Sequence, residues 1–193
     1  MNKRSGIESK KKIIKAAMDV FSVKGYAKTS IREIARAAGI SVGGVYLYFR
    51  NKEELYKSLI NEKMRDIGAS LRLAAGDTES PAEALSNLLK MHLEHALKHK
   101  EFILVHIREH GFAFGVQEKR KFFKEQRALI GHIIQRGIQS GAFRECNPED
   151  MATIILGSLR GILLSIALDQ DVHITPEMLN EFIFKGLLKT KSS

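Results

Sequence analysis

Five of the seven histidines of this chain lie between residues 92 and 110, a density that raises the question of metal ligation. His95 and His99 are four residues apart, as are His106 and His110, so each pair would share one face of a helix. The stretch from His106 to His110 also has the His-x-x-Glu-His spacing of one class of zinc hydrolase. A catalytic zinc ion needs a third protein ligand and an open position, and no pattern fixes that geometry here.

We therefore expect no metal site, no cofactor and no catalytic residue, so the chain is not expected to be an enzyme. The sequence contains no nucleophile elbow, no glycine-rich phosphate loop and no cysteine cluster. The histidines are interpreted as core or solvated side chains, or as polar groups of a ligand pocket. A bound metal effector stays open as an alternative, and so does a metal-dependent hydrolase that uses the cluster from His92 to His110.

A second group of chemically capable residues lies in a strongly basic N-terminal region. Residues 1–57 contain 13 Lys/Arg and 5 Asp/Glu, a net charge of +8, whereas the remaining 136 residues contain 18 and 17, a net charge of +1. A localised basic module on a nearly neutral body is typical of nucleic-acid binding. An anionic membrane surface is the competing partner, but it would require bulky apolar residues exposed along a basic helix. We expect no membrane span, because the longest apolar run contains Arg160.

Short helices separated by glycines must position these basic and hydroxyl side chains. Apolar spacing predicts four of them, over 9–24, 30–38, 41–49 and from 51 to about 73. Ser30 and Glu33 form a capping box, Gly39 ends that helix, and Ser41 caps the next one. Two short helices joined by a glycine turn form a helix-turn-helix, whose second helix enters the major groove of DNA.

The predicted recognition helix has an unusual composition, with two glycines followed by three aromatic residues. A helix surface without side chains at Gly43 and Gly44 can approach the duplex closely. The hydroxyls of Tyr46 and Tyr48 can donate hydrogen bonds to phosphate oxygens. Phe49 is predicted to anchor this helix in the core.

The run over residues 25–55, GYAKTSIREIARAAGISVGGVYLYFRNKEEL, resembles the DNA-binding domain of the tetracycline-repressor (TetR) family. The match holds in order and without gaps through Thr-Ser-Ile, Ile-Ala-x-x-Ala-Gly-Ile-Ser, Gly-x-Val-Tyr-x-Tyr-Phe and Asn-Lys-Glu-x-Leu. The resemblance, with the reading of the residues above, assigns DNA contact to Lys28, Thr29, Ser30, Arg32, Ser41, Val42, Gly43, Gly44, Tyr46, Tyr48 and Lys52.

The resemblance also implies a role for several of these residues. Thr29 and Ser30 would place backbone N–H groups and a hydroxyl on a phosphate. Tyr46 and Tyr48 would hold the DNA backbone, and Lys52 would bind another phosphate.

Base reading is the point at which this sequence departs from the family. Val42 and Gly44 stand where family members often carry base-reading side chains, and neither offers a hydrogen bond. Base reading is therefore expected to depend on Arg32 and on DNA shape. A basic arm, with lysine or arginine at 3, 4 and 10–12, either contacts DNA or is merely solvated.

The rest of the chain predicts a helical body. Further helices are expected over 81–99, 101–110, 118–140, 148–168 and 176–188. The fold class is therefore all-α: an N-terminal three-helix DNA-binding module with a helix-turn-helix, joined by a long helix to a C-terminal helical ligand-binding and dimerisation bundle. The DNA-binding domain is expected over 1–57, and the effector-binding and dimerisation domain over 58–193.

A homodimer is expected for two reasons. One helix-turn-helix reads too few bases, whereas a two-fold dimer reads a palindrome. A stripe of small residues at Gly157, Gly161 and Ser165 would let another helix approach closely. The resemblance implies a four-helix bundle made by helices 118–140 and 148–168 of two subunits.

The expected function is that of a ligand-responsive transcriptional repressor, released from a palindromic operator by an apolar or amphipathic small molecule such as a fatty acyl derivative, a phenolic compound or a drug. Candidate effector-binding residues are His92, Phe102, His106, Arg108, Phe112 and Phe114. A DNA-binding protein without an effector is the alternative. The single Cys146 forms no internal disulfide and fits the cytoplasm, where we expect the protein to act.

Overall fold

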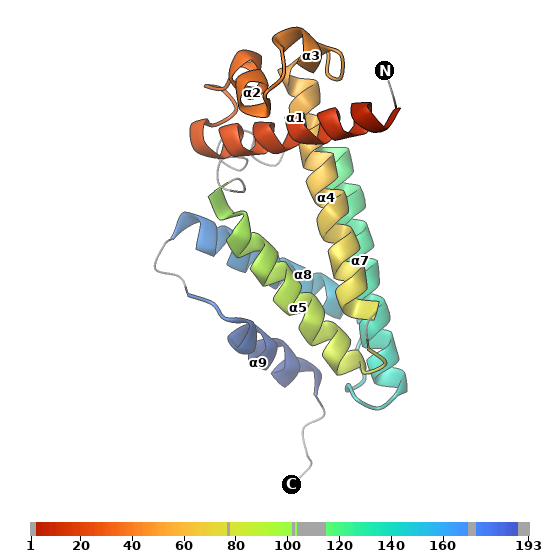
Figure 1. The fold of residues 1–193 in the computed structure, drawn as a ribbon. Helices are drawn as coiled ribbons and strands as arrows, with labels where there is room; N and C mark the ends of the chain where they lie inside the picture. Colours follow the sequence, from red (N-terminus) through yellow and green to blue (C-terminus); the bar gives the residue numbers. More distant parts are fainter. Residues whose placement is uncertain (1–2, 77, 102, 104–114, 170–172, 189–193) are drawn as a thin grey trace. The chain divides into compact units, whose positions relative to one another are not determined.

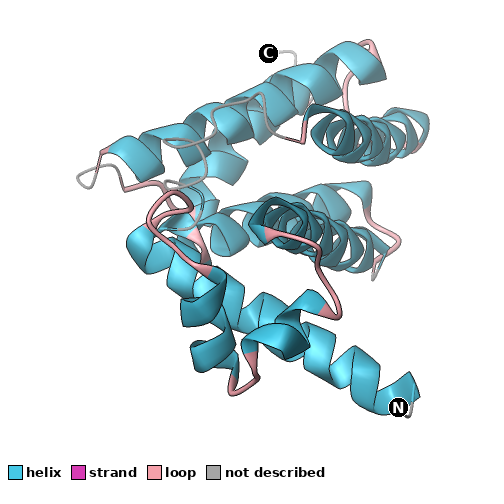
Figure 2. Ribbon diagram, turned by 90° about the horizontal axis from the view of Figure 1, so that it is seen from above, coloured by secondary structure: helices cyan, strands magenta, loops and turns pink. Residues whose placement is uncertain are grey.

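The computed structural model describes residues 3–76, 78–101, 103, 115–169 and 173–188, and every regular element in that part is a helix (Figures 1 and 2). The helices are α1 (Lys3–Lys24), α2 (Ile31–Ala38), α3 (Val42–Tyr46), α4 (Lys52–Gly76), α5 (Pro81–Lys98), α7 (Val116–Gln139), α8 (Pro148–Leu168) and α9 (Pro176–Leu187). The all-α prediction is confirmed. The predicted helix 101–110 falls outside the described residues, apart from residues 101 and 103.

The chain forms two compact units, each with its own apolar core. The first unit comprises residues 1–64 and 101–118, and the second comprises residues 65–100 and 119–193. The division falls within α4, which begins in the first unit and ends in the second. The boundary after residue 57 stays a prediction.

The core of the first unit is built mainly by α1 and the start of α4. Ile13, Ala17 and Phe21 recur every fourth residue of α1, so they lie on one face of the helix, and all three are fully buried. Phe21 meets Tyr56 edge-on, with ring centroids 5.0 Å apart. Helix α2 packs on α1 through the buried Ile34, and α3 packs on α2. Burial of aliphatic and aromatic side chains of this size stabilises the unit by about 1.5–3 kcal/mol each.

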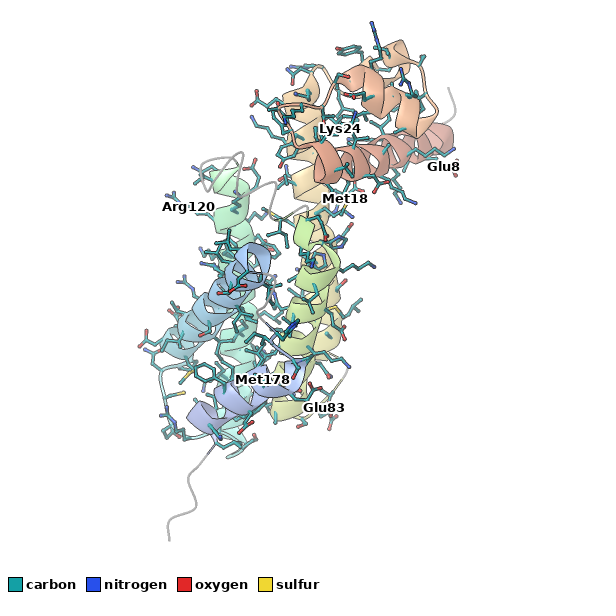
Figure 3. All side chains as sticks on the ribbon, turned by 90° about the vertical axis from the view of Figure 1, so that its left-hand side faces the viewer. Glu8, Met18, Lys24, Glu83, Arg120 and Met178 are labelled. Atoms are coloured by element: carbon teal, nitrogen blue, oxygen red, sulfur yellow. The ribbon has the colours of Figure 1, made fainter. Side chains whose placement is uncertain are left out.

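The core of the second unit is formed by the end of α4 together with α5, α7, α8 and α9 (Figure 3). Leu85 and Leu88 of α5 are fully buried, and α5 packs against α8 and α9. Gly137 of α7 leaves room for the ring of Phe143, because a Cβ at this position would lie only 2.0 Å from a ring carbon. Packing in this unit therefore depends on a missing side chain as well as on large ones.

Predicted helix starts in the second unit are confirmed by their caps. Ser80, Asn147 and Thr175 each accept a hydrogen bond from a backbone N–H of the helix that follows, and each precedes a proline. Such caps satisfy N–H groups that have no partner within the helix. The predicted starts of α5, α8 and α9 therefore agree with the structure.

Three helix bounds in the N-terminal part differ from the prediction. Helix α1 begins at Lys3, so the predicted basic arm forms its first turns. Helix α3 ends at Tyr46, because the chain continues as a turn that brings Phe49 into the core. Helix α4 continues to Gly76. None of the described helices is long and apolar enough to cross a membrane.

Candidate nucleic-acid interface and ligand-binding residues

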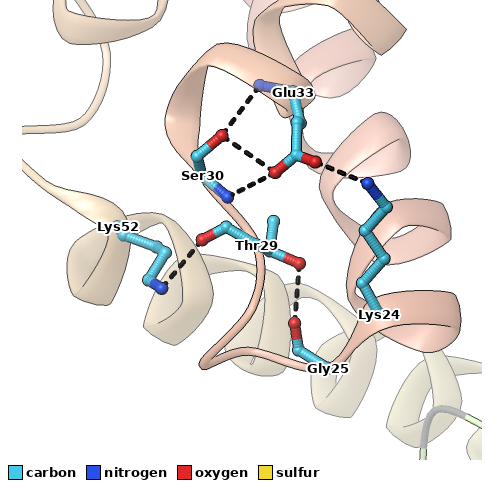
Figure 4. A network of polar contacts seen from close by, with 6 residues as sticks. All are labelled: Lys24, Gly25, Thr29, Ser30, Glu33 and Lys52. Atoms are coloured by element: carbon cyan, nitrogen blue, oxygen red, sulfur yellow. Dashed lines mark hydrogen bonds and ion pairs between the residues drawn. The ribbon is translucent and has the colours of Figure 1, made fainter.

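The segment from Ser30 to Gly44 has the geometry of a capped helix-turn-helix. The hydroxyl of Ser30 accepts a bond from the Glu33 N–H, and the Ser30 N–H donates to the Glu33 carboxylate over 2.8 Å (Figure 4). Gly39 ends α2 at φ 65°, a left-handed conformation that glycine adopts without a Cβ penalty. The Ser41 hydroxyl then accepts from the Gly44 N–H at 3.0 Å. Both predicted caps and the glycine turn are confirmed.

Glu33 also forms an ion pair within this motif. The Nζ atom of Lys24 lies 2.5 Å from Glu33 Oε1. The bonds from Lys24 and then from Ser30 lower the pKa of Glu33 to about 2. The carboxylate therefore stays ionised at neutral pH and holds the start of α2 against the end of α1.

Helix α3 presents a small exposed face. Val42 is 37% exposed and Tyr46 is 51% exposed. Gly43 is exposed too, and a Cβ built on it would have no atom within 4 Å, so nothing in the fold requires glycine there. At Gly44, in contrast, a Cβ would lie 2.6 Å from Cγ2 of Ile40, so local packing requires the glycine. Both glycines are interpreted as a surface for close approach to DNA, but packing within the described residues explains Gly44 and does not explain Gly43.

Two residues to which the resemblance gives phosphate contacts use their polar groups inside the first unit. Thr29 is only 3% exposed, and its hydroxyl donates to the carbonyl oxygen of Gly25 at 2.6 Å. The Nζ atom of Lys52 lies 2.7 Å from the carbonyl oxygen of Tyr26 and 2.8 Å from that of Thr29. These contacts give both side chains a structural role, and their contacts to DNA stay predictions.

The remaining predicted DNA-binding residues differ in exposure. Lys28 and Arg32 are exposed. Tyr48 is partly buried against the core, and its hydroxyl lies 3.8 Å from the position of a Cβ on Gly6. Arg36 is exposed too and lies one turn after Arg32 on α2, which makes it a further candidate for DNA contact that the sequence analysis did not name. The spacing of four residues between the two arginines was the signal that could have identified it.

Three buried side-chain atoms in the second unit have no hydrogen-bond partner within the described part of the chain: Nε2 of His92, Oε1 of Gln126 and Oδ1 of Asn180. His92 is 5% exposed, and burial, with a smaller effect of His95, lowers its pKa to about 4, so the ring is uncharged at neutral pH. Unpartnered buried polar atoms are rare because they cost free energy. These atoms are therefore candidates for recognition of a ligand.

The other predicted effector-binding residues, Phe102, His106, Arg108, Phe112 and Phe114, lie outside the described residues. In the described part of the histidine cluster, the rings of His95 and His99 are 4.5 Å apart, as their spacing on one helix predicts. No group of three or more possible metal ligands occurs among the described residues.

Exposed apolar side chains gather on the last two helices of the second unit. Helix α8 exposes Ile154 and Leu168, and Cβ atoms built on Gly157 and Gly161 would meet no other atom. Helix α9 exposes Met178 and Phe182, whereas α7, which is described throughout, exposes no large apolar side chain. Exposed large apolar side chains on neighbouring elements are candidates for an interface.

Sequence comparison finds relatives for most of the chain. The profile of the family described as "Bacterial regulatory proteins, tetR family" matches residues 13–59, and the profile "Tetracyclin repressor-like, C-terminal domain" matches residues 78–163. The uncharacterized HTH-type transcriptional regulator YerO of Bacillus subtilis (strain 168) is 28% identical in an alignment of 190 positions that covers 93% of this chain and 63% of YerO. The chain thus spans less than two thirds of the length of this relative.

Solved structures share the fold. The transcriptional regulator FadR from Bacillus subtilis, in complex with stearoyl-CoA, superposes with a TM-score of 0.71 at 23% sequence identity. The match covers 90% of this chain and 95% of the FadR chain. AibR, in complex with isovaleryl coenzyme A and operator DNA, superposes with a TM-score of 0.67 at 21% sequence identity. The match covers 93% of this chain and 98% of the AibR chain. At these identities the likeness concerns the fold.

Proposed function

The chain belongs to the tetR family of bacterial regulatory proteins, and from this membership we propose that it is a transcriptional repressor released from its operator by a small molecule. It acts in the cytoplasm and binds a palindromic site as a homodimer. The observation that carries the proposal is the capped helix-turn-helix, because it is complete and its second helix is exposed in a region of net charge +8, residues 1–57.

Docking on DNA uses the N-terminal half of α3. Gly43 permits close approach of the helix to the major groove, and Val42 can contact the methyl group of a thymine. Tyr46 and the exposed cations Lys28 and Arg32 bind phosphates and nearby base edges. Because phosphate contacts release counterions, affinity falls steeply as the salt concentration rises.

The homodimer forms through α8. Gly157 and Gly161 allow another helix to approach closely, and Ile154 supplies apolar contact area. The exposed side chains favour α9 as the second helix of the interface, in place of the expected helix 118–140. A two-fold axis then presents two recognition helices to half-sites about 34 Å apart.

The effector is an acyl-coenzyme A or a related acyl thioester. FadR and AibR were solved with ligands of this class. In this chain, Nε2 of the uncharged His92 ring can donate to a neutral acceptor such as a thioester carbonyl, and Oε1 of Gln126 can accept from a donor such as an amide N–H of the coenzyme A portion. Release follows from linkage: the ligand binds more tightly to a conformation in which the recognition helices no longer match the half-sites. Helix α4 begins in one unit and ends in the other, so it is the element that carries this change.

Selection of binding sites from random DNA tests the proposal. We expect one palindromic sequence and a footprint with two-fold symmetry. Fluorescence anisotropy on that site then follows titration with stearoyl-CoA, isovaleryl-CoA, stearate and coenzyme A, and an acyl-CoA should displace the protein. Binding that no acyl-CoA weakens would contradict the effector assignment and favour constitutive DNA binding. Metal analysis by mass spectrometry tests the hydrolase alternative.

A further inference from the structure

Lys52 is the first residue of α4, and the resemblance to the family implies that it binds a phosphate. We propose that Lys52 is a positioning residue, which fixes the turn in front of α2 and does not neutralise an operator phosphate. The role rests on the proposed DNA binding, because it concerns how the helix-turn-helix is held for that purpose.

The ammonium group of Lys52 is held by backbone carbonyl oxygens of the chain itself. Its Nζ lies 2.7 Å from the carbonyl oxygen of Tyr26, 2.8 Å from that of Thr29 and 3.4 Å from that of Ala27. An ammonium group has three N–H donors; two of them have acceptors at normal hydrogen-bond distance, and the carbonyl oxygen of Ala27 is a longer third contact. The Nζ atom also lies 4.3 Å from the centroid of the Tyr26 ring, where a cation is attracted to the ring face. A phosphate would have to displace these contacts.

The position of Lys52 in the helix is otherwise unfavourable for a cation. The N-terminal turn carries the positive end of the helix dipole, where the acidic Glu53 and Glu54 fit and a lysine does not. The carbonyl oxygens supply the negative partial charge that offsets this repulsion. The internal contacts therefore explain why a lysine is stable at this position, with no need of an external anion.

The carbonyl oxygens that bind Lys52 belong to the turn between α1 and α2, directly before the helix-turn-helix. The carbonyl oxygen of Thr29 accepts from Lys52, and the hydroxyl of Thr29 donates to the carbonyl oxygen of Gly25 at 2.6 Å (Figure 4). The next residue, Ser30, is the N-cap of α2. The start of α2 is thus tied to the first residue of α4 on one side and to the end of α1 on the other. Loss of the ammonium group would free the turn and the helix that follows it.

Salt dependence distinguishes positioning from phosphate contact. A lysine that neutralises a phosphate contributes about 0.9 to the slope of log affinity against log salt concentration. A positioning lysine changes affinity and leaves that slope unchanged. Lys28 lies exposed in the same turn and loses the same charge when substituted, so Lys28→Met is the matched control for Lys52→Met.

Operator affinity measured across a salt series is the first test. For Lys52→Met we expect binding about tenfold weaker, as follows from loss of charge-assisted hydrogen bonds, with the wild-type slope. For Lys28→Met we expect a slope smaller by roughly 1 per subunit. The same reduction in Lys52→Met would overturn the positioning role.

Lys52→Arg provides the second test. Arginine binds phosphate at least as well as lysine, in a planar bidentate geometry that does not match three converging carbonyl oxygens. We therefore expect Lys52→Arg to weaken binding as Lys52→Met does. Wild-type affinity in Lys52→Arg would contradict the proposal, because a phosphate contact tolerates this change.

The third test uses the wild-type protein, so its result does not depend on whether the Lys52 variants fold. In ¹⁵N-lysine-labelled protein without DNA, we expect the ammonium protons of Lys52 to exchange with water more slowly than those of Lys28. Equal exchange rates would refute the internal contacts. This measurement is independent of operator binding. Absence of any salt-dependent binding by the wild-type protein would instead count against the proposed function.

Discussion

The two units of the molecule differ in how their buried and partly buried polar groups are hydrogen-bonded. In the first unit, the Thr29 hydroxyl and the Lys52 ammonium group both bond to backbone carbonyl oxygens. In the second unit, His92, Gln126 and Asn180 each bury an atom that has no partner within the described part of the chain. Among the described residues, these groups of the first unit are bonded internally, whereas the second unit contains buried polar atoms without a partner.

This difference fits the proposed function, in which the first unit reads DNA and the second senses a ligand. A satisfied polar network holds one conformation, which suits a surface that must fit a half-site. An unsatisfied group costs free energy until something binds it, so it favours the liganded state over the empty one. The contrast can be tested by perturbing each unit separately.

Acidification should produce the largest difference in stability between the two units. Burial lowers the pKa of His92 from 6.5 to about 4, so below pH 6.5 the unfolded chain binds a proton that the folded chain does not. The second unit should therefore lose about 3 kcal/mol as the pH falls from 6.5 to 4. The pKa of Glu33 is lowered from 4.5 to about 2, so its contribution to the first unit is lost only below about pH 4.5.

Hydrogen exchange followed by mass spectrometry reports each unit separately and checks this pH dependence. Peptides of α5 should lose protection between pH 6.5 and 4, while peptides of α2 keep theirs. His92→Leu is the control, because the variant lacks the titrating ring. If both units lost protection in parallel between pH 6.5 and 4, their stabilities would not differ in pH dependence as expected.

Two apolar substitutions should change stability in opposite directions. Thr29→Val keeps the side-chain shape but leaves the Gly25 carbonyl oxygen without its hydroxyl donor, at a cost of about 1–2 kcal/mol. His92→Leu removes an unpartnered buried atom and should raise stability by about 1 kcal/mol at neutral pH, with loss of the response to acyl-CoA. Urea unfolding at pH 7.5 measures both changes. Destabilisation by His92→Leu would mean that the ring has a partner in the unliganded protein.

The smallest change in stability is expected at Gly43. The methyl group of Gly43→Ala meets no atom of the described residues and should stabilise α3 by up to about 1 kcal/mol, while operator binding should weaken because in the proposed docking this position faces the DNA. Gly44→Ala is the matched control, and it should destabilise the first unit by about 1 kcal/mol or more through the contact with Ile40. Thermal unfolding and anisotropy distinguish the two effects. Unchanged operator affinity in Gly43→Ala would place this face of α3 away from the duplex.

Local signals account for what could be predicted from the sequence. The caps at Ser30, Ser41, Ser80, Asn147 and Thr175 depend on backbone N–H groups two or three residues away, so they can be recognised within a few letters. The same holds for the glycine turn at Gly39, whose φ of 65° suits a residue without a Cβ. Helix order and the DNA-binding motif followed from these signals.

Long-range contacts could not be predicted in this way. The bond from Lys52 to Thr29 spans 23 residues, and the bond from Asn180 to Ser86 spans 94. The sequence pattern identifies a lysine near a turn, but it does not tell whether the ammonium group faces solvent or carbonyl oxygens. For the same reason the sequence did not show which helix pairs with α8 in a dimer: the resemblance implied helix 118–140, whereas the exposed apolar side chains favour α9.

The open space around Gly43 has a consequence for how the protein can change over generations. Most positions in a small folded unit are constrained by their neighbours, so a new side chain there must first be accommodated by the core. At Gly43 an added Cβ meets no atom of the described residues, so in the proposed docking the operator surface selects among substitutions. A mutation at this single codon can therefore explore new operator preferences at little cost in folding. Duplicated copies of the gene could diverge in the sites they recognise while keeping the same scaffold.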